Sequence, residues 1–140
     1  MNNNQIEQAQ HSIHYVHELI HRVFTHADGN GEASITELMK AFAKDFRMVT
    51  TSATTVDRSQ VEQLFRSSVG GRPGLKIIIT DLHTVWQEDE TVALSYTETH
   101  RQGDNVTSRV SVAILRVQAG GVEWQYLHET AFTPQSGTTR

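Results

Sequence analysis

The chain has 140 residues, of which 37% are hydrophobic, and it carries a formal net charge of -4 and no cysteine. This length suits one domain, expected over residues 1–140 with a core at about 6–132 and flexible tails at 1–5 and 133–140. The acidic balance argues against a nucleic-acid partner. The lack of cysteine excludes disulfides and thiolate sites. The polar N-terminus and the short apolar runs predict a cytoplasmic protein without a membrane partner.

The first third of the chain has the periodicity of helices. Apolar residues recur there at three- and four-residue steps, the spacing of one helical stripe. A cluster of turn formers at 28–31 ends this first helix. Ser34 and Glu37 have the spacing of a capping box, so a second helix is expected over 34–44. The stripe of the first helix consists of Ile6, Ala9, Ile13, Val16, Ile20 and Val23.

The middle and the end of the chain have the pattern of strands. Residues 46–56 are rich in Thr and predict a short hairpin. Asp57 and Gln60 predict the cap of a third helix, which two glycines at 70 and 71 would end. Long β-rich segments then predict a four-stranded antiparallel meander, and such strands must coil, so that a sheet backed by helices encloses a cone. These segments are 75–86, 92–100, 106–117 and 122–132.

This order of elements resembles the nuclear transport factor 2-like superfamily over about residues 6–132. The last strand, with Trp124 followed by His128, resembles the Trp-x-x-x-His closing strand of the ketosteroid-isomerase-like and calmodulin-dependent-kinase-association-domain-like branches. The resemblance implies an α+β, cystatin-like fold. In that fold a cone-shaped, curved antiparallel sheet, made of a short hairpin and a four-stranded meander, packs against three helices from the N-terminal half.

The same resemblance leaves the function open, because the superfamily holds ketosteroid isomerases, SnoaL-like polyketide cyclases, dehydratases and epoxide hydrolases beside non-catalytic binding domains. The isomerase branch needs a carboxylate base on the first hairpin. Here residues 47–56 contain no Asp or Glu. This departure from the family pattern argues against steroid isomerisation.

Strand alternation indicates which side chains would line a cavity in the cone. Side chains on one face of a strand repeat every two residues. Two runs that would each share a face combine aromatic with ionisable residues. They are Tyr96, Glu98 and His100 in the second strand of the meander, and Trp124, Tyr126 and His128 in the last strand. The alternative is that Glu98 and His100 only mark where their strand emerges into water.

Several of these residues suit acid–base chemistry. The imidazole of His128, beside Glu98, would exchange a proton with a carbonyl or hydroxyl substrate, with Tyr96 or Tyr126 as hydrogen-bond donor. The alternative for His128 is a core histidine bonded to a backbone carbonyl. Arg109 either anchors a carboxylate in the cone or pairs with an acidic neighbour outside it, and His83 is a further candidate for the cavity wall.

Histidines are also frequent in the first helix. His14, His17 and His21 flank its apolar stripe, but no carboxylate stands at the matching step to complete a metal site. We therefore expect neither a metal nor another cofactor.

The first strand of the meander carries apolar residues on both faces. Ile77 and Ile79 alternate with Ile78, and the helices cover only one side of the sheet. A homodimer packed through the outer sheet face is the expected solution.

Two functions remain open from the sequence. The first is a dimeric domain that binds a small hydrophobic or carbonyl ligand in the cone without catalysis. The alternative is an enzyme of the isomerase, cyclase or dehydratase type that uses His and Glu on a small carbonyl or hydroxyl substrate. Ionisable groups that converge in one cavity favour the enzyme, and a mainly apolar cavity favours binding alone.

Overall fold

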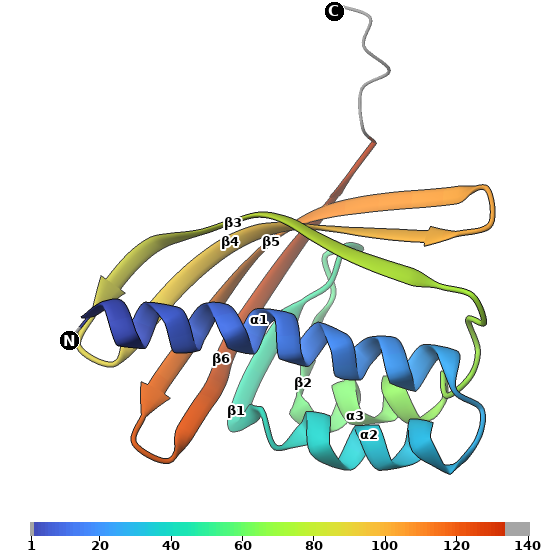
Figure 1. Cartoon of the computed structure of the whole chain (residues 1–140), viewed down its shortest axis with the longest axis horizontal. Helices are drawn as coiled ribbons and strands as arrows, with labels where there is room; N and C mark the ends of the chain where they lie inside the picture. The colour runs from blue at the N-terminus through green and yellow to red at the C-terminus, as the bar shows by residue number, and fades with distance from the viewer. Residues whose placement is uncertain (1, 134–140) are drawn as a thin grey trace, which may run out of the picture.

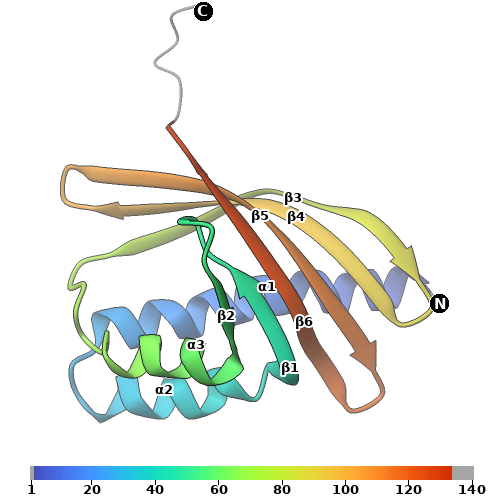
Figure 2. The ribbon, with the colours of Figure 1, turned by 180° about the vertical axis from the view of Figure 1, so that it is seen from behind.

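A computed structural model describes residues 2–133 as three helices packed against one face of a six-stranded sheet (Figure 1). Most strands are long and coil strongly, so the sheet curves around α1 when seen from either side (Figure 2). In chain order the elements are α1 (Asn2–Thr25), α2 (Gly29–Met39), β1 (Phe42–Val49), β2 (Thr55–Asp57), α3 (Arg58–Arg66), β3 (Lys76–Glu88), β4 (Thr91–Gln102), β5 (Asn105–Gln118) and β6 (Gly121–Phe132).

The strand order of the sheet is β2-β1-β6-β5-β4-β3. The hairpin β1–β2 and the meander β3 to β6 are antiparallel, as the sequence predicts. The sheet is nevertheless mixed, because β1 runs parallel to β6. The pairing of β1 with β6 joins the hairpin to the last strand, and the sheet remains open. The arrangement of three helices on one sheet confirms the predicted α+β class.

The second helix differs from the prediction. It begins at Gly29, where the Asp28 carboxylate accepts from the backbone N–H of Asn30 at 3.0 Å, so Asp28 is the cap and Ser34 lies buried inside the helix. The helix also ends five residues earlier than predicted, at Met39. Phe42 is drawn into β1 instead, where it pairs with Trp124.

The predicted cap of the third helix is confirmed. The Asp57 carboxylate accepts from the N–H of Gln60 at 2.9 Å, and the Gln60 side chain accepts from the N–H of Asp57 at 2.9 Å. The helix ends at Arg66, before the predicted glycines. Gly70 has a φ of +66° and donates to the carbonyl of Val23 at 2.8 Å, which ties the loop after α3 to α1. A side chain at Gly70 would also lie 2.6 Å from Ala27, so only glycine fits.

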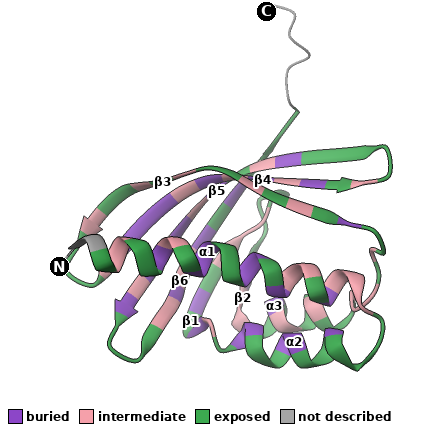
Figure 3. Ribbon diagram, viewed as in Figure 1, coloured by how far each residue is buried: buried purple, intermediate pink, exposed green. Residues whose placement is uncertain are grey.

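The core lies between α1 and the concave face of the sheet, called here the inner face (Figure 3). Ile13, Val16 and Val23 of the predicted helical stripe are buried in the same core cluster as Leu94 and Leu115 of the sheet. Residues 2–5, predicted as part of a tail, already belong to α1, whereas residues 134–140 of the tail predicted at 133–140 lie outside the described residues. Within 2–133, none of the helices combines the length and apolar character needed to span a bilayer.

Candidate functional site

A cavity of about 300 Å³ lies between α1, α3 and the inner face of the sheet. Exposed Thr51 and Leu64 also line it, so the cavity reaches the surface. Its walls are mainly apolar and come from α1, β1, α3 and β6. The large apolar side chains in its walls include Phe24, Phe46, Phe65, Trp124 and Leu127.

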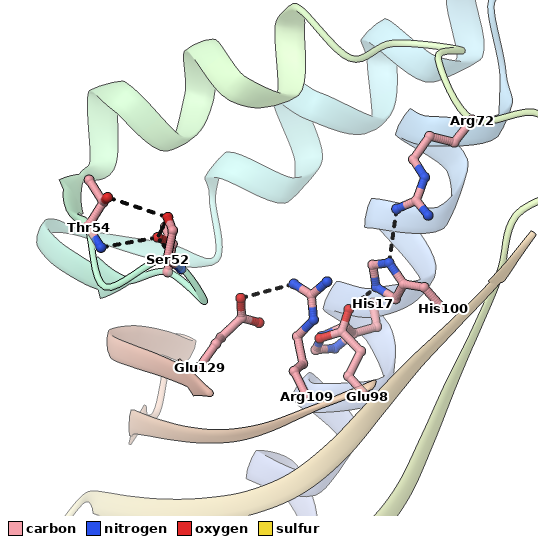
Figure 4. Close-up of polar contacts among 9 residues, drawn as sticks. His17, Ser52, Thr54, Arg72, Glu98, His100, Arg109 and Glu129 are labelled. Atoms are coloured by element: carbon pink, nitrogen blue, oxygen red, sulfur yellow. Dashed lines mark hydrogen bonds and ion pairs between the residues drawn. The ribbon is translucent and has the colours of Figure 1, made fainter. Parts of the chain in front are cut away.

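One end of this cavity is polar, and five segments of the chain supply it (Figure 4). Two hydrogen-bonded groups of side chains meet there, one built on α1 and β4 and the other on β5 and β6. We call these side chains the polar end: His17 from α1, Arg72 from the loop after α3, Glu98 and His100 from β4, Arg109 from β5, and Glu129 from β6.

His17 and Glu98 form a buried ion pair. The Nε2 of His17 lies 3.1 Å from Oε1 of Glu98, and each side chain is 5% exposed. The Nδ1 of His17 lies 2.7 Å from the carbonyl oxygen of Ile13, which can only accept, so this nitrogen carries a hydrogen. Because both ring nitrogens face acceptors, His17 is an imidazolium beside an ionised Glu98.

His100 is neutral in the same network. The guanidinium of Arg72 only donates, and its Nη1 lies 3.0 Å from Nδ1 of His100, so this nitrogen is an acceptor. The hydrogen of the ring is therefore on Nε2, which donates to Oε2 of Glu98. Glu98 thus accepts from histidines on both sides.

The pKa shifts of Glu98 and His17 agree with a charged pair. Burial alone would raise the pKa of Glu98, but the charge of His17 and the hydrogen bonds from His100 and His17 hold it well below its usual range. Burial alone would lower the pKa of His17, yet the charge and hydrogen bond of Glu98 outweigh burial and raise it. Each member of the pair therefore keeps the other charged.

Glu129 has the opposite character. It is 6% exposed, and Nη1 of Arg109 donates to its Oε1 at 3.1 Å. Burial and the nearby charge of Glu98 raise its pKa, and Arg109 offsets only part of that effect. The cavity therefore holds one carboxyl group kept ionised and one shifted toward its protonated form.

The last strand faces the cavity differently from the prediction. Leu115 pairs with Trp124 but Ile114 pairs with Tyr126, so Gln125 is an extra residue that forms a bulge in β6. The bulge reverses the alternation after Trp124. Consequently Trp124 lines the cavity, whereas Tyr126 and His128 do not, and the two are joined to each other by a 2.9 Å hydrogen bond on the outer face.

The remaining predicted site residues divide between the two faces. Glu98, His100 and Arg109 line the cavity, and the alternative of Arg109 outside the cone is wrong, although it does pair with an acidic neighbour. Tyr96 is on the inner face but lies beneath His17, with ring centroids 5.3 Å apart, and does not line the cavity. His83 is exposed and pairs in register with Ser95 on the outer face.

Three members of the polar end are not among the site residues predicted from the sequence. His17 continues the apolar stripe four residues after Ile13, a position that could have marked it as buried. Glu129 is not among the predicted site residues, because the bulge at Gln125 that turns it inward has no local signal in the sequence. Arg72 lies in a loop and has no periodic pattern to place it.

A second hollow lies outside, between α1 and α2. It is larger, about 540 Å³, but it is an open groove lined largely by exposed side chains such as Tyr15, Glu37 and Lys40. No buried ion pair faces this groove within the described residues. The interior cavity is therefore the better candidate for a site.

Neither a protein-family profile nor a curated protein sequence matches the chain. Solved structures do match. The chain is similar to an NTF-2 like protein of unknown function from Pseudomonas aeruginosa, with a TM-score of 0.81 and 30% identity over 90% of this chain and 99% of the other.

Two more distant structures share the fold alone. A candidate dehydratase of the NTF2-like family from Streptomyces avermitilis has a TM-score of 0.77 and 14% identity, over 96% of this chain and all of the other. A candidate calcium/calmodulin-dependent kinase II association domain from Exiguobacterium sibiricum has a TM-score of 0.63 and 12% identity, over 91% of this chain and 93% of the other.

Proposed function

Because the chain belongs to the nuclear transport factor 2-like superfamily, we propose that it binds a small, mainly apolar organic molecule in the interior cavity. The observation that supports this most is the combination of aromatic walls with one polar end in a single cavity. Ligand sites commonly have this composition, since apolar walls provide binding energy and a few polar groups orient the ligand. A volume of about 300 Å³ holds roughly ten water molecules, so the ligand is small.

Filling the cavity tests this proposal. Leu127 is 8% exposed and lines the cavity, so Leu127→Trp should occupy the space that the ligand needs. We expect heteronuclear NMR titration with phenethyl alcohol to shift the amide signals of cavity residues in the wild type but not in this variant. Val106→Trp, at an exposed position of β5 that does not line the cavity, is the control. Equal shifts in both variants would place the ligand elsewhere.

A second candidate function is acid–base catalysis in the same cavity. It is favoured by one specific observation, the opposite pKa shifts of Glu98 and Glu129, because separated carboxyl pKa values commonly mark an acid and a base. Glu129 would exchange the proton, and Arg109, which holds its Oε1, would orient it and stabilise a developing oxyanion. His128 is not part of this proposal.

Hydrogen exchange tests the catalytic candidate. An enzyme that removes a proton beside a carbonyl should accelerate the exchange of the methylene hydrogens of phenylacetone in heavy water, which NMR follows directly. Glu129→Gln should abolish the acceleration, whereas Glu123→Gln, on the same strand but outside the cavity lining, should leave it unchanged. Without any acceleration by the wild type, the binding function stands alone.

We also propose that the protein forms a homodimer through the outer face of the sheet. Ile78, Trp86 and Val110 project there with exposed fractions of 38%, 51% and 42%. Trp86 and Ile114 lie in one cross-strand row with Tyr126, which makes the patch continuous from β3 to β6. An apolar patch of this kind is typical of an association surface.

A further inference from the structure

The charges of the polar end do not balance. Arg109 pairs with Glu129 at 3.1 Å, and His17 pairs with Glu98 at 3.1 Å. Arg72 contributes a further positive charge but contacts only neutral groups. The polar end therefore has one more cationic group than it has carboxylates.

The contacts of Arg72 show why its charge is uncompensated. Its Nη1 donates to the neutral ring of His100, its Nε donates to the side-chain oxygen of Gln102 at 3.4 Å, and its guanidinium carbon lies 5.9 Å from the centre of the Phe24 ring. None of the carboxylates in residues 2–133 forms an ion pair with it. A half-buried guanidinium at a cavity wall thus keeps donors available for a further acceptor.

The surroundings of Arg72 are apolar. The Phe24 ring beside it packs on the Phe65 ring, with the two ring centroids 6.0 Å apart, and both side chains line the cavity. A molecule that reached Arg72 would therefore rest its hydrocarbon part on aromatic side chains while its polar group met the guanidinium (Figure 4 shows Arg72 directed toward His100).

We infer that the ligand of the cavity is an apolar carboxylate whose anionic group is bound by Arg72. This inference rests on the proposed binding function and specifies its ligand class. A carboxylate matches the planar fork of a guanidinium and supplies the missing negative charge. An alcohol of the same shape supplies no charge, and an amine brings a further cation beside Arg72 and Arg109.

Three probes with the same ring and chain test this inference. Phenylacetate, phenethyl alcohol and phenethylamine are titrated separately into the full-length protein at pH 7 by calorimetry. We expect phenylacetate to bind at least about tenfold more tightly than the alcohol, the difference expected for one charge-assisted hydrogen bond, and the amine to bind most weakly. Added salt should weaken the binding of phenylacetate but not that of the alcohol.

Two arginine variants assign the effect to one residue. Arg72→Gln should bring the affinities for phenylacetate and for the alcohol within about twofold of each other, and continued binding of the alcohol shows that the cavity is still formed. Arg66→Gln is the matched control, because Arg66 is paired with Glu62 on the exposed side of α3 and should leave the preference unchanged.

The possible outcomes separate the two proposals. If none of the probes binds the wild type, the binding function fails and this inference fails with it. If the alcohol binds as tightly as phenylacetate, or if Arg72→Gln keeps the preference, the carboxylate inference is wrong while the binding function stands. Should Arg72→Gln not fold, the ranking of the probes and its salt dependence in the wild type still decide.

Discussion

His17 and Glu98 are separated by most of the chain, yet they share one buried hydrogen bond that joins α1 to β4. Removing one partner leaves the other charge buried without compensation, which typically costs about 3–5 kcal/mol. We expect His17→Gln to lower the free energy of unfolding by this amount, as measured by urea denaturation. His14→Gln, at an exposed position of the same helix, is the control and should have little effect.

The same pair predicts how stability depends on pH. The pKa of Glu98 is depressed in the folded protein, so its contribution is present above the ordinary value of 4.5 and is lost as the pH falls toward the depressed value. The pKa of His17 is raised, so its contribution is present below the ordinary value of 6.5 and is lost as the pH rises through the raised value. The pair therefore stabilises the fold most between pH 4.5 and 6.5.

The difference in unfolding free energy between the wild type and His17→Gln isolates this contribution. We expect the difference to be largest near pH 5.5 and to shrink toward both pH 3 and pH 9. A difference that did not vary with pH would mean that His17 acts through packing and not through charge.

The capping box of α3 sets the position of one cavity wall. Val61 and Phe65 of this helix face the cavity, and Arg58 at its start donates to the carbonyls of Met39 and Phe42. Loss of a capping carboxylate usually costs about 1 kcal/mol. We expect Asp57→Ala to lower the free energy of unfolding by about that amount in urea denaturation.

The matched control for this variant is Asp45→Ala. Asp45 is an exposed aspartate whose side chain caps no helix, so its loss should change stability by less than about 0.5 kcal/mol. Equal effects of the two substitutions would show that the loss of negative charge, and not of the cap, is responsible.

At the scale of the whole molecule, no layer formed by residues 2–133 covers the outer face of the sheet. Val110 is 42% exposed on this face in the middle of β5. A lysine there would place a charge inside the proposed interface, where its burial costs several kcal/mol. We expect the wild type to sediment as a dimer and Val110→Lys as a monomer.

Tyr15→Lys is the control for the dimer, since Tyr15 is 38% exposed on α1, on the helical side of the molecule. This variant should sediment like the wild type. A wild type that is monomeric at every concentration would refute the interface directly.

Much of this architecture can be predicted from the sequence, because it depends on local patterns. The stripe from Ile13 to Val23 predicts α1, alternation predicts β4, and the spacing of Asp57 and Gln60 predicts the start of α3. In each case the signal lies within a few residues, since helical periodicity, strand alternation and capping are properties of neighbouring positions. The fold class follows from such signals, and so does the grouping of Glu98 with Tyr96 and His100 on one face of β4.

Tertiary structure alone decided which further residues complete the polar end. The bulge at Gln125 places Glu129 inside and His128 outside, and its position depends on how β6 pairs with β5 rather than on the residues of β6 alone. The charge of His17 depends on Glu98 across the core, and the neutral form of His100 depends on Arg72 from a loop. A buried charge is stable only with its partners, and these partners come from distant parts of the chain that only folding brings together.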